Sequence, residues 1–336
     1  MSMNLIKLKW PINLQQTLLG GQSFRWTQSD EYFIGIFANI AWKIKADECD
    51  LSYEVIGELP YPTDANCLRI KVEKPKITSK KGLVLYEQKY YEQLLNKYFR
   101  LDSNLDEDYN IWIEAHKHFK SKTSKDQTFI TQLDQEIVET LFSFICSQNN
   151  HISRISSLVE KLCTNYGELI CSTDGRSFYN FPSLEKLSKD EEMESKLRNL
   201  GFGYRAKYIA KAAKDISNKG GVKWLDSLTR LNYPKAHDEL IKLPGIGPKV
   251  GDCICLMALN FLEAVPVDTH IIQVAQHYIP EVTKVKSMNL KLYRKIGDTF
   301  RSVYGLKAGV AQTVLFCKEL SIFNEGEPVE KKKKKK

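Results

Sequence analysis

The stretch Leu243-Pro-Gly-Ile-Gly-Pro-Lys249 decides the fold of this chain, because it sets two glycines and a lysine between segments with helical spacing. Glycine suits positions where the backbone takes a positive φ or closely approaches another group. Amides at the start of the following helix would point at an anion, helped by the helix dipole. The stretch therefore predicts a helix-hairpin-helix element whose Gly245 and Gly247 hold a DNA phosphate without reading base sequence. The alternative is a simple helix–helix turn, which a Gly-x-Gly pattern alone favours.

Lys249 favours the DNA-binding hairpin over the simple turn, because it lies at the start of the second helix. The positive end of the helix dipole favours a neutral amine, and a neutral amine can attack C1′ of a deoxyribose to expel the base. Cys253 and Met257 follow at helical spacing and are expected to form an apolar strip beside the amine. The alternative is that Lys249 only contacts phosphate.

Asp268 ends the segment Val265-Pro-Val-Asp268 and is expected to cap the helix that follows. Backbone amides would hold its carboxylate rigid and ionised. It could then stabilise positive charge on the sugar or assist proton movement at the lysine, although many capping aspartates are only structural. His270 is expected at the same helix end, where it binds phosphate or simply lies on the surface.

The formal net charge of +8 comes mostly from the run Lys331–Lys336. Without that run, 43 basic residues face 41 acidic ones, so nucleic-acid affinity must come from a local basic face. The lysine run is either a nuclear-import signal, a DNA-contacting arm or a solvated end. The N-terminal residues lack a signal-peptide core and no apolar run approaches the ~20 residues of a membrane span, so an intracellular protein is expected. The lysine run favours the nucleus, with an additional mitochondrial pool as the alternative.

The eight cysteines are scattered and include no Cys-x-x-Cys pair. Neither a zinc site, a redox motif nor an iron–sulfur cluster is indicated. The sequence therefore predicts an enzyme without a cofactor.

Short aromatic and β-branched runs predict strands near 32–37, 41–45 and 51–55, and a long loop follows between Pro60 and Lys81. From about residue 86 the spacing is helical, including helices at 236–243, 249–260 and 308–323 around the hairpin and near the end. The predicted fold class is α+β, with an N-terminal antiparallel β-sheet domain packed on an all-α domain. The predicted divisions are 1–115, 116–323 and a disordered lysine-rich tail at 324–336.

Several segments of the chain resemble those of a known family. The hairpin and Asp268 are similar to those of the helix-hairpin-helix glycosylase superfamily. Three further segments resemble the eukaryotic 8-oxoguanine DNA glycosylases: Gly21-Gln-Ser-Phe-Arg-Trp26, Leu141-Phe-Ser-Phe-Ile-Cys-Ser-Gln-Asn-Asn150 and Asp252-Cys-Ile-Cys-Leu-Met-Ala-Leu259. The resemblance runs from about residue 10 to 320 and weakens through 60–85 and 120–133.

The resemblance implies roles for the residues that match. Lys249 would be the Schiff-base nucleophile and Asp268 the catalytic carboxylate. The backbone carbonyl of Gly21 would accept the N7 hydrogen that 8-oxoguanine has and guanine lacks. Gln312 would bond the Watson–Crick edge of the flipped base, and Phe316 would stack on its ring with Cys253 on the opposite face.

The resemblance also implies contacts to the rest of the DNA. Asn149, Arg154 and Arg205 would fill the gap in the duplex and bond the orphaned cytosine, while Tyr204 would wedge into the base stack. In the family the hairpin can also hold a cation through backbone carbonyls, which here means a candidate site at Ile241, Leu243 and Ile246.

The leading prediction is a monomeric enzyme that removes 8-oxoguanine paired with cytosine in double-stranded DNA and then cleaves the strand by β-elimination. One alternative is a thymine-glycol type glycosylase, against which the Gly21–Trp26 segment and the missing cysteine cluster argue. Another is a non-catalytic protein that uses the hairpin as a DNA-backbone clamp. A third is a glycosylase that seldom completes strand cleavage.

Overall fold

The computed structural model describes residues 3–60, 87–125, 127–284 and 288–320. Most of the predicted loop after Pro60 and the whole predicted tail at 324–336 lie outside these residues. In the described part, no helix has the length and apolar character that crossing a membrane requires.

The N-terminal part of the chain forms an antiparallel sheet of five strands, in the order β1-β5-β4-β3-β2. The strands are β1 (Asn4–Lys7), β2 (Trp26–Ser29), β3 (Tyr32–Phe37), β4 (Ile40–Ala46) and β5 (Asp50–Glu58). The three predicted strands correspond to β3, β4 and β5, so this part of the prediction is confirmed.

The sheet shares one hydrophobic core with helices from both ends of the chain. The N-terminal helices are α1 (Leu14–Leu19), α2 (Gln88–Phe99), α3 (Leu105–Ala115) and α4 (Lys117–Thr123). The C-terminal ones are α13 (Thr269–Ala275), η2 (Pro280–Lys284), α14 (Leu290–Tyr304) and α15 (Ala308–Glu319), while the exposed turn η3 (Gly305–Lys307) joins α14 to α15. Trp42, Phe119 and Phe300 are fully buried in this core, so segments far apart in sequence are held together by apolar packing.

A second core is built from the middle of the chain together with Phe24 from the N-terminal part. Its helices are α5 (Ile137–Ser147), α6 (Ile152–Tyr166), α7 (Leu184–Lys189), α8 (Met193–Asn199), α9 (Arg205–Asn218), α10 (Val222–Ser227), η1 (Leu228–Arg230), α11 (Tyr233–Leu240) and α12 (Pro248–Ala258). The helices predicted on either side of the hairpin are α11 and α12. The predicted last helix is α15, which ends at Glu319, and the predicted residues 321–323 lie outside the described residues.

A two-stranded hairpin, β6 (Leu169–Thr173) and β7 (Arg176–Tyr179), interrupts the helices. The prediction that the chain stays helical after residue 86 is wrong here. Its turn residues Asp174 and Gly175 both have positive φ, as a two-residue hairpin turn requires. The hairpin packs against β4 and β5 of the large sheet.

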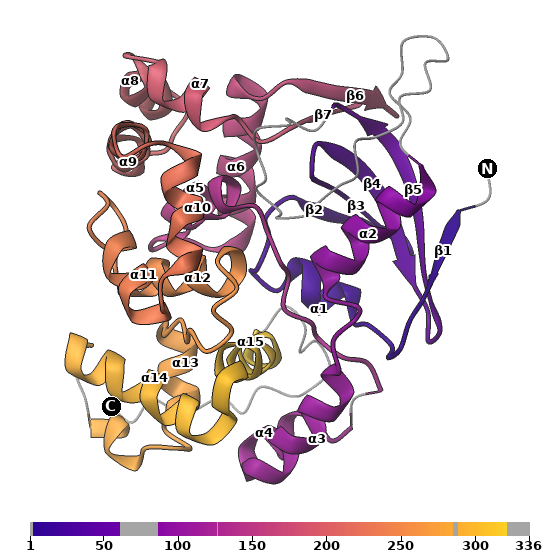
Figure 1. Ribbon diagram of the computed structural model, residues 1–336, viewed down its shortest axis with the longest axis vertical. Helices are drawn as coiled ribbons and strands as arrows, with labels where there is room; N and C mark the ends of the chain where they lie inside the picture. The colour runs from indigo at the N-terminus through magenta and orange to yellow at the C-terminus, as the bar shows by residue number, and fades with distance from the viewer. Residues whose placement is uncertain (1–2, 61–86, 126, 285–287, 321–336) are drawn as a thin grey trace, which may run out of the picture.

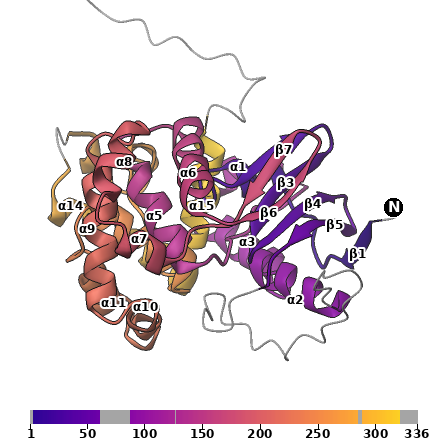
Figure 2. The same cartoon turned by 90° about the horizontal axis from the view of Figure 1, so that it is seen from above.

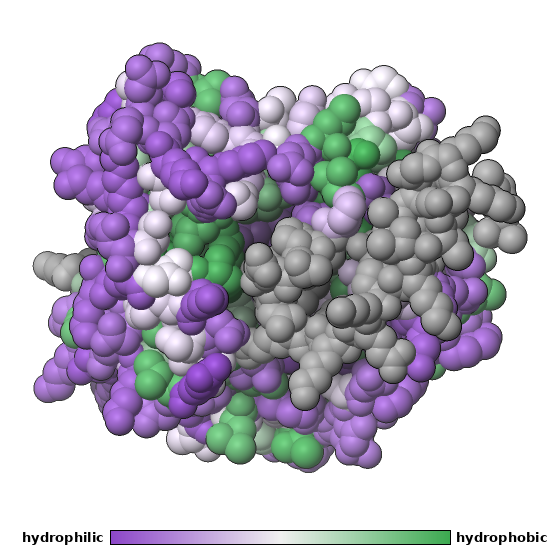
Figure 3. Space-filling view, turned by 45° about the horizontal axis from the view of Figure 1, so that its top comes forward, coloured by the Kyte–Doolittle hydropathy of each residue, from purple (hydrophilic) through white to green (hydrophobic). Residues whose placement is uncertain are grey.

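The sheet lies on one side of the molecule and helices α5–α12 lie on the other, with α15 between them (Figure 1, Figure 2). Polar side chains cover most of the helical side in the view of Figure 3, and apolar side chains show there as separate patches. The α+β fold class, with an antiparallel sheet packed on a helical domain, is confirmed.

Candidate active site

The glycine hairpin joins α11 to α12, and its two glycines have different roles. Gly245 has a φ of +79°, and a Cβ there would lie 2.5 Å from the Cβ of Tyr208. Its carbonyl accepts a 2.8 Å hydrogen bond from the side chain of Gln148. Gly247 has an ordinary φ of −90°, and a Cβ there would meet nothing within 4 Å. Gly245 is thus required by its positive φ and by the close packing of Tyr208, while Gly247 leaves the N-terminus of α12 open.

Next to the hairpin, a pocket lies where the two cores meet. Seven predicted residues line it: Gly21, Lys249, Cys253, Met257, Asp268, Gln312 and Phe316. Its volume is about 40 Å³, room for only about three water molecules. A nucleobase would therefore need side chains at its rim to move, and half-buried Phe316 is one such side chain.

Lys249 extends from the first turn of α12 into this pocket. Its Nζ atom lies 5.1 Å from the ring centre of Phe144, a cation–π contact. Cys253 follows one turn later and is buried, and burial raises the pKa of its thiol to about 11, against a smaller lowering by the charge of Lys249. The thiol is therefore neutral near pH 7, and with buried Met257 it gives the predicted apolar strip beside the amine.

Asp268 caps α13, as predicted, because its Oδ1 accepts a 2.9 Å hydrogen bond from the amide of Ile271. The carboxylate is half-buried and lines the same pocket as Lys249. The ring of His270 stands edge-on to Phe316, with ring centres 5.6 Å apart, outside the pocket lining.

The glycines before β2 close the pocket from the sheet side. Gly21 has a φ of +84°, and a Cβ there would lie 3.5 Å from the ring of Phe316. At Gly20 a Cβ would lie 2.2 Å from the carbonyl oxygen of Gln16 and 2.6 Å from the sulfur of Cys317. A side chain at Gly20 would therefore clash with Gln16 and Cys317, whereas at Gly21 the Cβ would make ordinary contact with Phe316 and the positive φ is what disfavours a side chain.

The four residues predicted to contact the orphaned cytosine and the base stack lie around the start of α6 and α9. Tyr204 is 46% exposed, and its hydroxyl donates to the carbonyl of Gln148 at 3.2 Å. Arg205 is buried and donates to the carbonyls of Gln148 and Asn149. Arg154 is exposed on α6. The structure therefore brings Tyr204, Arg205 and Asn149 together, with Arg205 holding the loop that carries Asn149.

Five pocket-lining residues were not singled out from the sequence: Gly20, Gln22, Phe144, Pro266 and Thr313. All five lie within or beside segments that the sequence analysis quotes, since Gln22, Phe144 and Pro266 fall inside quoted motifs and Gly20 and Thr313 adjoin predicted residues. Only their three-dimensional packing shows that they face the pocket.

A larger cavity of about 330 Å³ lies elsewhere, beside α11, α12 and α14. Its buried carboxylate is Asp252, which accepts hydrogen bonds from the hydroxyls of Tyr233 at 2.7 Å and of Tyr293. Burial raises the pKa of Asp252 above its usual range, against lowering by His237 and these hydroxyls. None of the predicted site residues lines this cavity. Asp252 is a buried acid whose hydrogen-bonding needs are met by the two tyrosine hydroxyls.

Among the described residues, no group of three or more His, Cys, Asp or Glu side chains could hold a metal ion. The candidate cation site in the hairpin depends on carbonyls instead. The Leu243 carbonyl accepts the amide of Ile246 at 3.1 Å, which leaves it a second lone pair. The Leu243 carbonyl is thus able to accept a further ligand, and the cation at Ile241, Leu243 and Ile246 stays a prediction.

Two family models together match most of the chain. The first, "8-oxoguanine DNA glycosylase, N-terminal domain", matches residues 5–141. The second, "HhH-GPD superfamily base excision DNA repair protein", matches residues 142–295.

Two curated relatives are similar over long stretches. An N-glycosylase/DNA lyase of Saccharomyces cerevisiae is 39% identical over 252 residues, which is 67% of this chain and 66% of the relative. The N-glycosylase/DNA lyase OGG1 of Arabidopsis thaliana is 42% identical over 191 residues, 56% of this chain and 51% of the relative. The matched stretches thus span just under two thirds and about half of these relatives.

Among solved structures, an 8-oxoguanine glycosylase/lyase from Clostridium acetobutylicum, bound to double-stranded DNA with cytosine opposite 8-oxoguanine, superimposes with a TM-score of 0.73. The match covers 97% of this chain and 100% of that one at 23% identity. This likeness shows that the two proteins share a fold.

Proposed function

The chain belongs to the helix-hairpin-helix GPD superfamily of base excision repair proteins and carries an 8-oxoguanine DNA glycosylase N-terminal domain, and from this premise we propose that it excises 8-oxoguanine paired with cytosine. The observation that carries the proposal is the convergence of Lys249 and Asp268 with Gly21, Gln312 and Phe316 on one pocket. A nucleophile, a carboxylate and residues able to contact the base are what base excision from a flipped nucleotide needs.

The chemistry follows from these side chains. Lys249 first gives up its ammonium proton to Asp268 or to water, and its amine then attacks C1′. The bond from C1′ to N9 breaks, and the departing base takes up a proton. Loss of a proton from the lysine nitrogen and opening of the sugar ring give a Schiff base. Removal of a proton from C2′ then expels the 3′ phosphate by β-elimination. Asp268, held by the amide of Ile271, stabilises positive charge on the sugar and assists these proton transfers.

Recognition of the base divides between the two sides of the pocket. The Gly21 carbonyl accepts the N7 hydrogen, which guanine lacks. From α15, the side chain of Gln312 bonds the Watson–Crick edge, and Phe316 stacks on one ring face opposite Cys253. The pocket lining supports these roles because all four residues face the same space.

The remaining contacts hold the duplex. The open amides beside Gly247 bind a DNA phosphate, helped by a cation at the Ile241, Leu243 and Ile246 carbonyls when one is bound. Exposed Tyr204 wedges into the base stack, while Asn149, Arg154 and Arg205 bond the orphaned cytosine. His270 contacts phosphate at the start of α13.

The enzyme acts on nuclear DNA as a monomer in this proposal. We also propose the domain bounds 1–115 for the β-rich domain, 116–323 for the helical domain and 324–336 for the lysine-rich tail, which serves as an import signal or as a DNA-contacting arm. Relatives named as DNA lyases support an activity on DNA.

Borohydride trapping tests the proposal directly. The wild type and Lys249→Gln are incubated with duplexes carrying 8-oxoguanine opposite each normal base, and reduced covalent adducts are counted. We expect an adduct with cytosine opposite, absent in Lys249→Gln, while that variant still binds the lesion. Lys242→Gln is the matched control, because Lys242 is exposed on the same hairpin and pairs with Glu239 at 2.5 Å. No wild-type adduct on any pairing, or an adduct that survives in Lys249→Gln, would contradict the proposal.

A further inference from the structure

A chain of buried side chains connects the two walls of the base pocket. Gln22 follows Gly21 on the sheet side, and Thr313 follows Gln312 on α15. Gln132, from the segment before α5, lies between them. Gln22, Gln132 and Thr313 are 2%, 1% and 4% exposed. Polar groups this deep persist only when they are hydrogen-bonded, so their arrangement is informative.

The amide of Gln22 makes four hydrogen bonds. Its Oε1 accepts from Gln132 Nε2 at 2.8 Å and from the amide of Leu133 at 2.9 Å. Its Nε2 donates to the carbonyls of Thr131 at 2.9 Å and Thr17 at 3.3 Å. Two acceptor positions and two donor hydrogens are thereby all used, and the orientation of this amide is fixed.

Gln132 carries the connection to α15. Its Oε1 lies 2.9 Å from Thr313 Oγ1, which also lies 3.0 Å from the carbonyl of Gly309. A hydroxyl has one hydrogen and serves one acceptor fully at a time. Threonine in a helix usually bonds the carbonyl four residues earlier, so Gln132 competes for this hydrogen and links α15 to the Gly21 loop.

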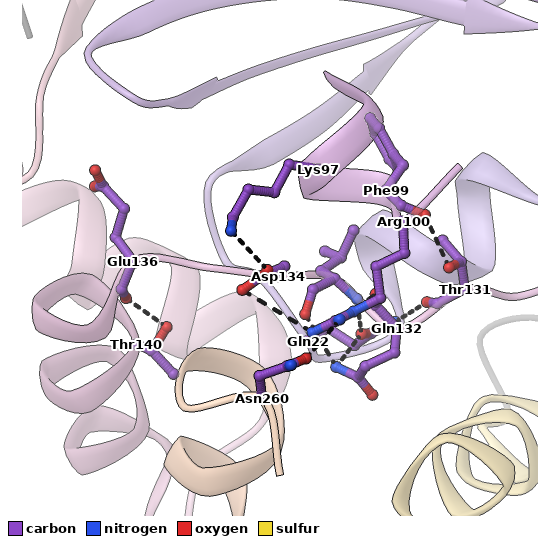
Figure 4. Close-up of polar contacts among 11 residues, drawn as sticks. Gln22, Lys97, Phe99, Arg100, Thr131, Gln132, Asp134, Glu136, Thr140 and Asn260 are labelled. Atoms are coloured by element: carbon purple, nitrogen blue, oxygen red, sulfur yellow. Dashed lines mark hydrogen bonds and ion pairs between the residues drawn. The ribbon is translucent and has the colours of Figure 1, made fainter. Parts of the chain in front are cut away.

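The segment that carries Gln132 is also held from its outer side (Figure 4). Arg100 donates from Nε to the Gln132 carbonyl at 3.0 Å and from Nη1 to Asn260 at 2.7 Å. Asp134 lies within 3.9 Å of Arg100 and 3.7 Å of Lys97. Gln132 is therefore held at both its backbone and its side chain.

A neighbouring contact ties the loop to the other wall of the pocket. The backbone carbonyl of Gln22 accepts from Gln135 Nε2 at 2.8 Å, and the amide of Gln135 donates to the carbonyl of Met257 at 2.8 Å. The backbone on one side of Gly21 is thus fixed relative to α12 by Gln135 and relative to α15 by Gln132.

We propose that Gln132 is a positioning residue that sets the distance between the Gly21 carbonyl and the base-contacting face of α15. The inference rests on the proposed function and deepens it. Recognition of 8-oxoguanine through a single main-chain acceptor depends on hydrogen-bond geometry, which weakens steeply when the donor and acceptor are misaligned. Gln132 touches no substrate and acts through Gln22 and Thr313, so it controls how well the base is recognised.

Gln132→Leu tests this, with Thr313→Val as a second variant that removes the same link from the other side. Single-turnover excision of 8-oxoguanine opposite cytosine is compared with cleavage of a duplex carrying an abasic site, which needs Lys249 but no base. We expect the ratio of excision to abasic cleavage to fall about tenfold in both variants, as small misplacements of reacting groups can cause. The combined Gln132→Leu/Thr313→Val variant should be no less stable to heat than Thr313→Val alone, because the Gln132 oxygen that loses its donor in Thr313→Val is also removed, yet it should keep the low ratio.

Thr123→Val is the matched control, because Thr123 is equally buried but bonds the carbonyl of Phe119 within its own helix α4, away from the pocket. It should lower thermal stability and leave the ratio unchanged. A loss of stability in Gln132→Leu with an unchanged ratio would reduce Gln132 to a structural residue and overturn the inference. A wild type that cleaves abasic DNA but leaves 8-oxoguanine in place would instead overturn the proposed function, and the inference with it.

Discussion

Substitution of Gly245 should destabilise the protein strongly, because two separate costs meet at this position. Its φ of +79° lies in the left-handed region, which costs a residue with a Cβ roughly 1–2 kcal/mol. The new Cβ would lie 2.5 Å from the Cβ of Tyr208, and such overpacking costs roughly 1–3 kcal/mol. Gly245→Ala should therefore lose about 3 kcal/mol of folding free energy. In a chain of 336 residues that loss lowers the Tm by roughly 4 °C.

Two further variants separate these costs by thermal unfolding. Gly245→Asn keeps the new Cβ but tolerates the left-handed backbone, so it should recover part of the loss and remain about 2 kcal/mol less stable than the wild type. Gly247→Ala adds a Cβ that meets nothing within 4 Å, so it should stay within about 1 kcal/mol of the wild type, the usual cost of alanine at a helix N-cap. A Gly245→Asn variant as stable as the wild type would refute the packing argument. A Gly247→Ala variant that folds normally but binds undamaged duplex more weakly would support phosphate binding at the hairpin.

Three other variants test the site and its support. Asp268→Asn should slow excision in single-turnover assays far more than it weakens lesion binding, because asparagine can still cap α13 through Ile271; an equal loss of both would contradict the catalytic role. Burial lowers the pKa of His118 to about 4. The folded state therefore favours the neutral imidazole, and the contribution of His118 to the free energy of unfolding is fully present above the unfolded pKa of about 6.5 and falls as the pH drops toward 4. Urea unfolding should show about 1 kcal/mol less stability at pH 5.5 than at pH 7.5 from this group, a difference that His118→Phe removes and substitution of an exposed histidine does not. Tyr293→Phe deletes one hydroxyl bonded to buried Asp252 and should cost about 2 kcal/mol in the same assay, whereas an unchanged stability would mean that water replaces the hydroxyl.

The predictable part of the fold is the part with local signals. Alternating apolar residues placed β3 to β5, and the glycine pair placed the α11–α12 hairpin, because both patterns are specified by residues close in sequence. The cap at Asp268 was predictable for the same reason, since its partner is the amide of Ile271 three residues later.

The hairpin β6–β7 has one local signal in the sequence, at its turn. Asp174-Gly175 is a strong two-residue turn signal, but the strands beside it are half exposed and carry little hydrophobic alternation. Their stability comes from packing on the large sheet, where Cys171 would contact any Cβ added at Gly57. That contact joins residues more than a hundred positions apart and has no local pattern.

Side-chain environments were harder to predict than elements. Arg205 was expected among the DNA-contacting residues, and nothing in its spacing shows that it is buried against the carbonyls of Gln148 and Asn149. The link from Gln22 through Gln132 to Thr313 was likewise invisible, because polar residues in sequence are expected on the surface. Only the meeting of three distant segments makes them a buried cluster.

The division of the site between two cores has a consequence for how activity and stability are related. Lys249, Cys253 and Met257 lie on α12, which belongs to the core of the middle helices. Asp268 caps α13, and Gln312 and Phe316 lie on α15, and both helices belong to the core shared with the sheet. The distance between Lys249 and Asp268 therefore stays constant only while the two cores keep the same position relative to each other. Gln135, bonded to Met257 on one side and Gln22 on the other, crosses this boundary within the described residues. Loss of its side chain should consequently reduce excision through the alignment of the cores, before either core unfolds.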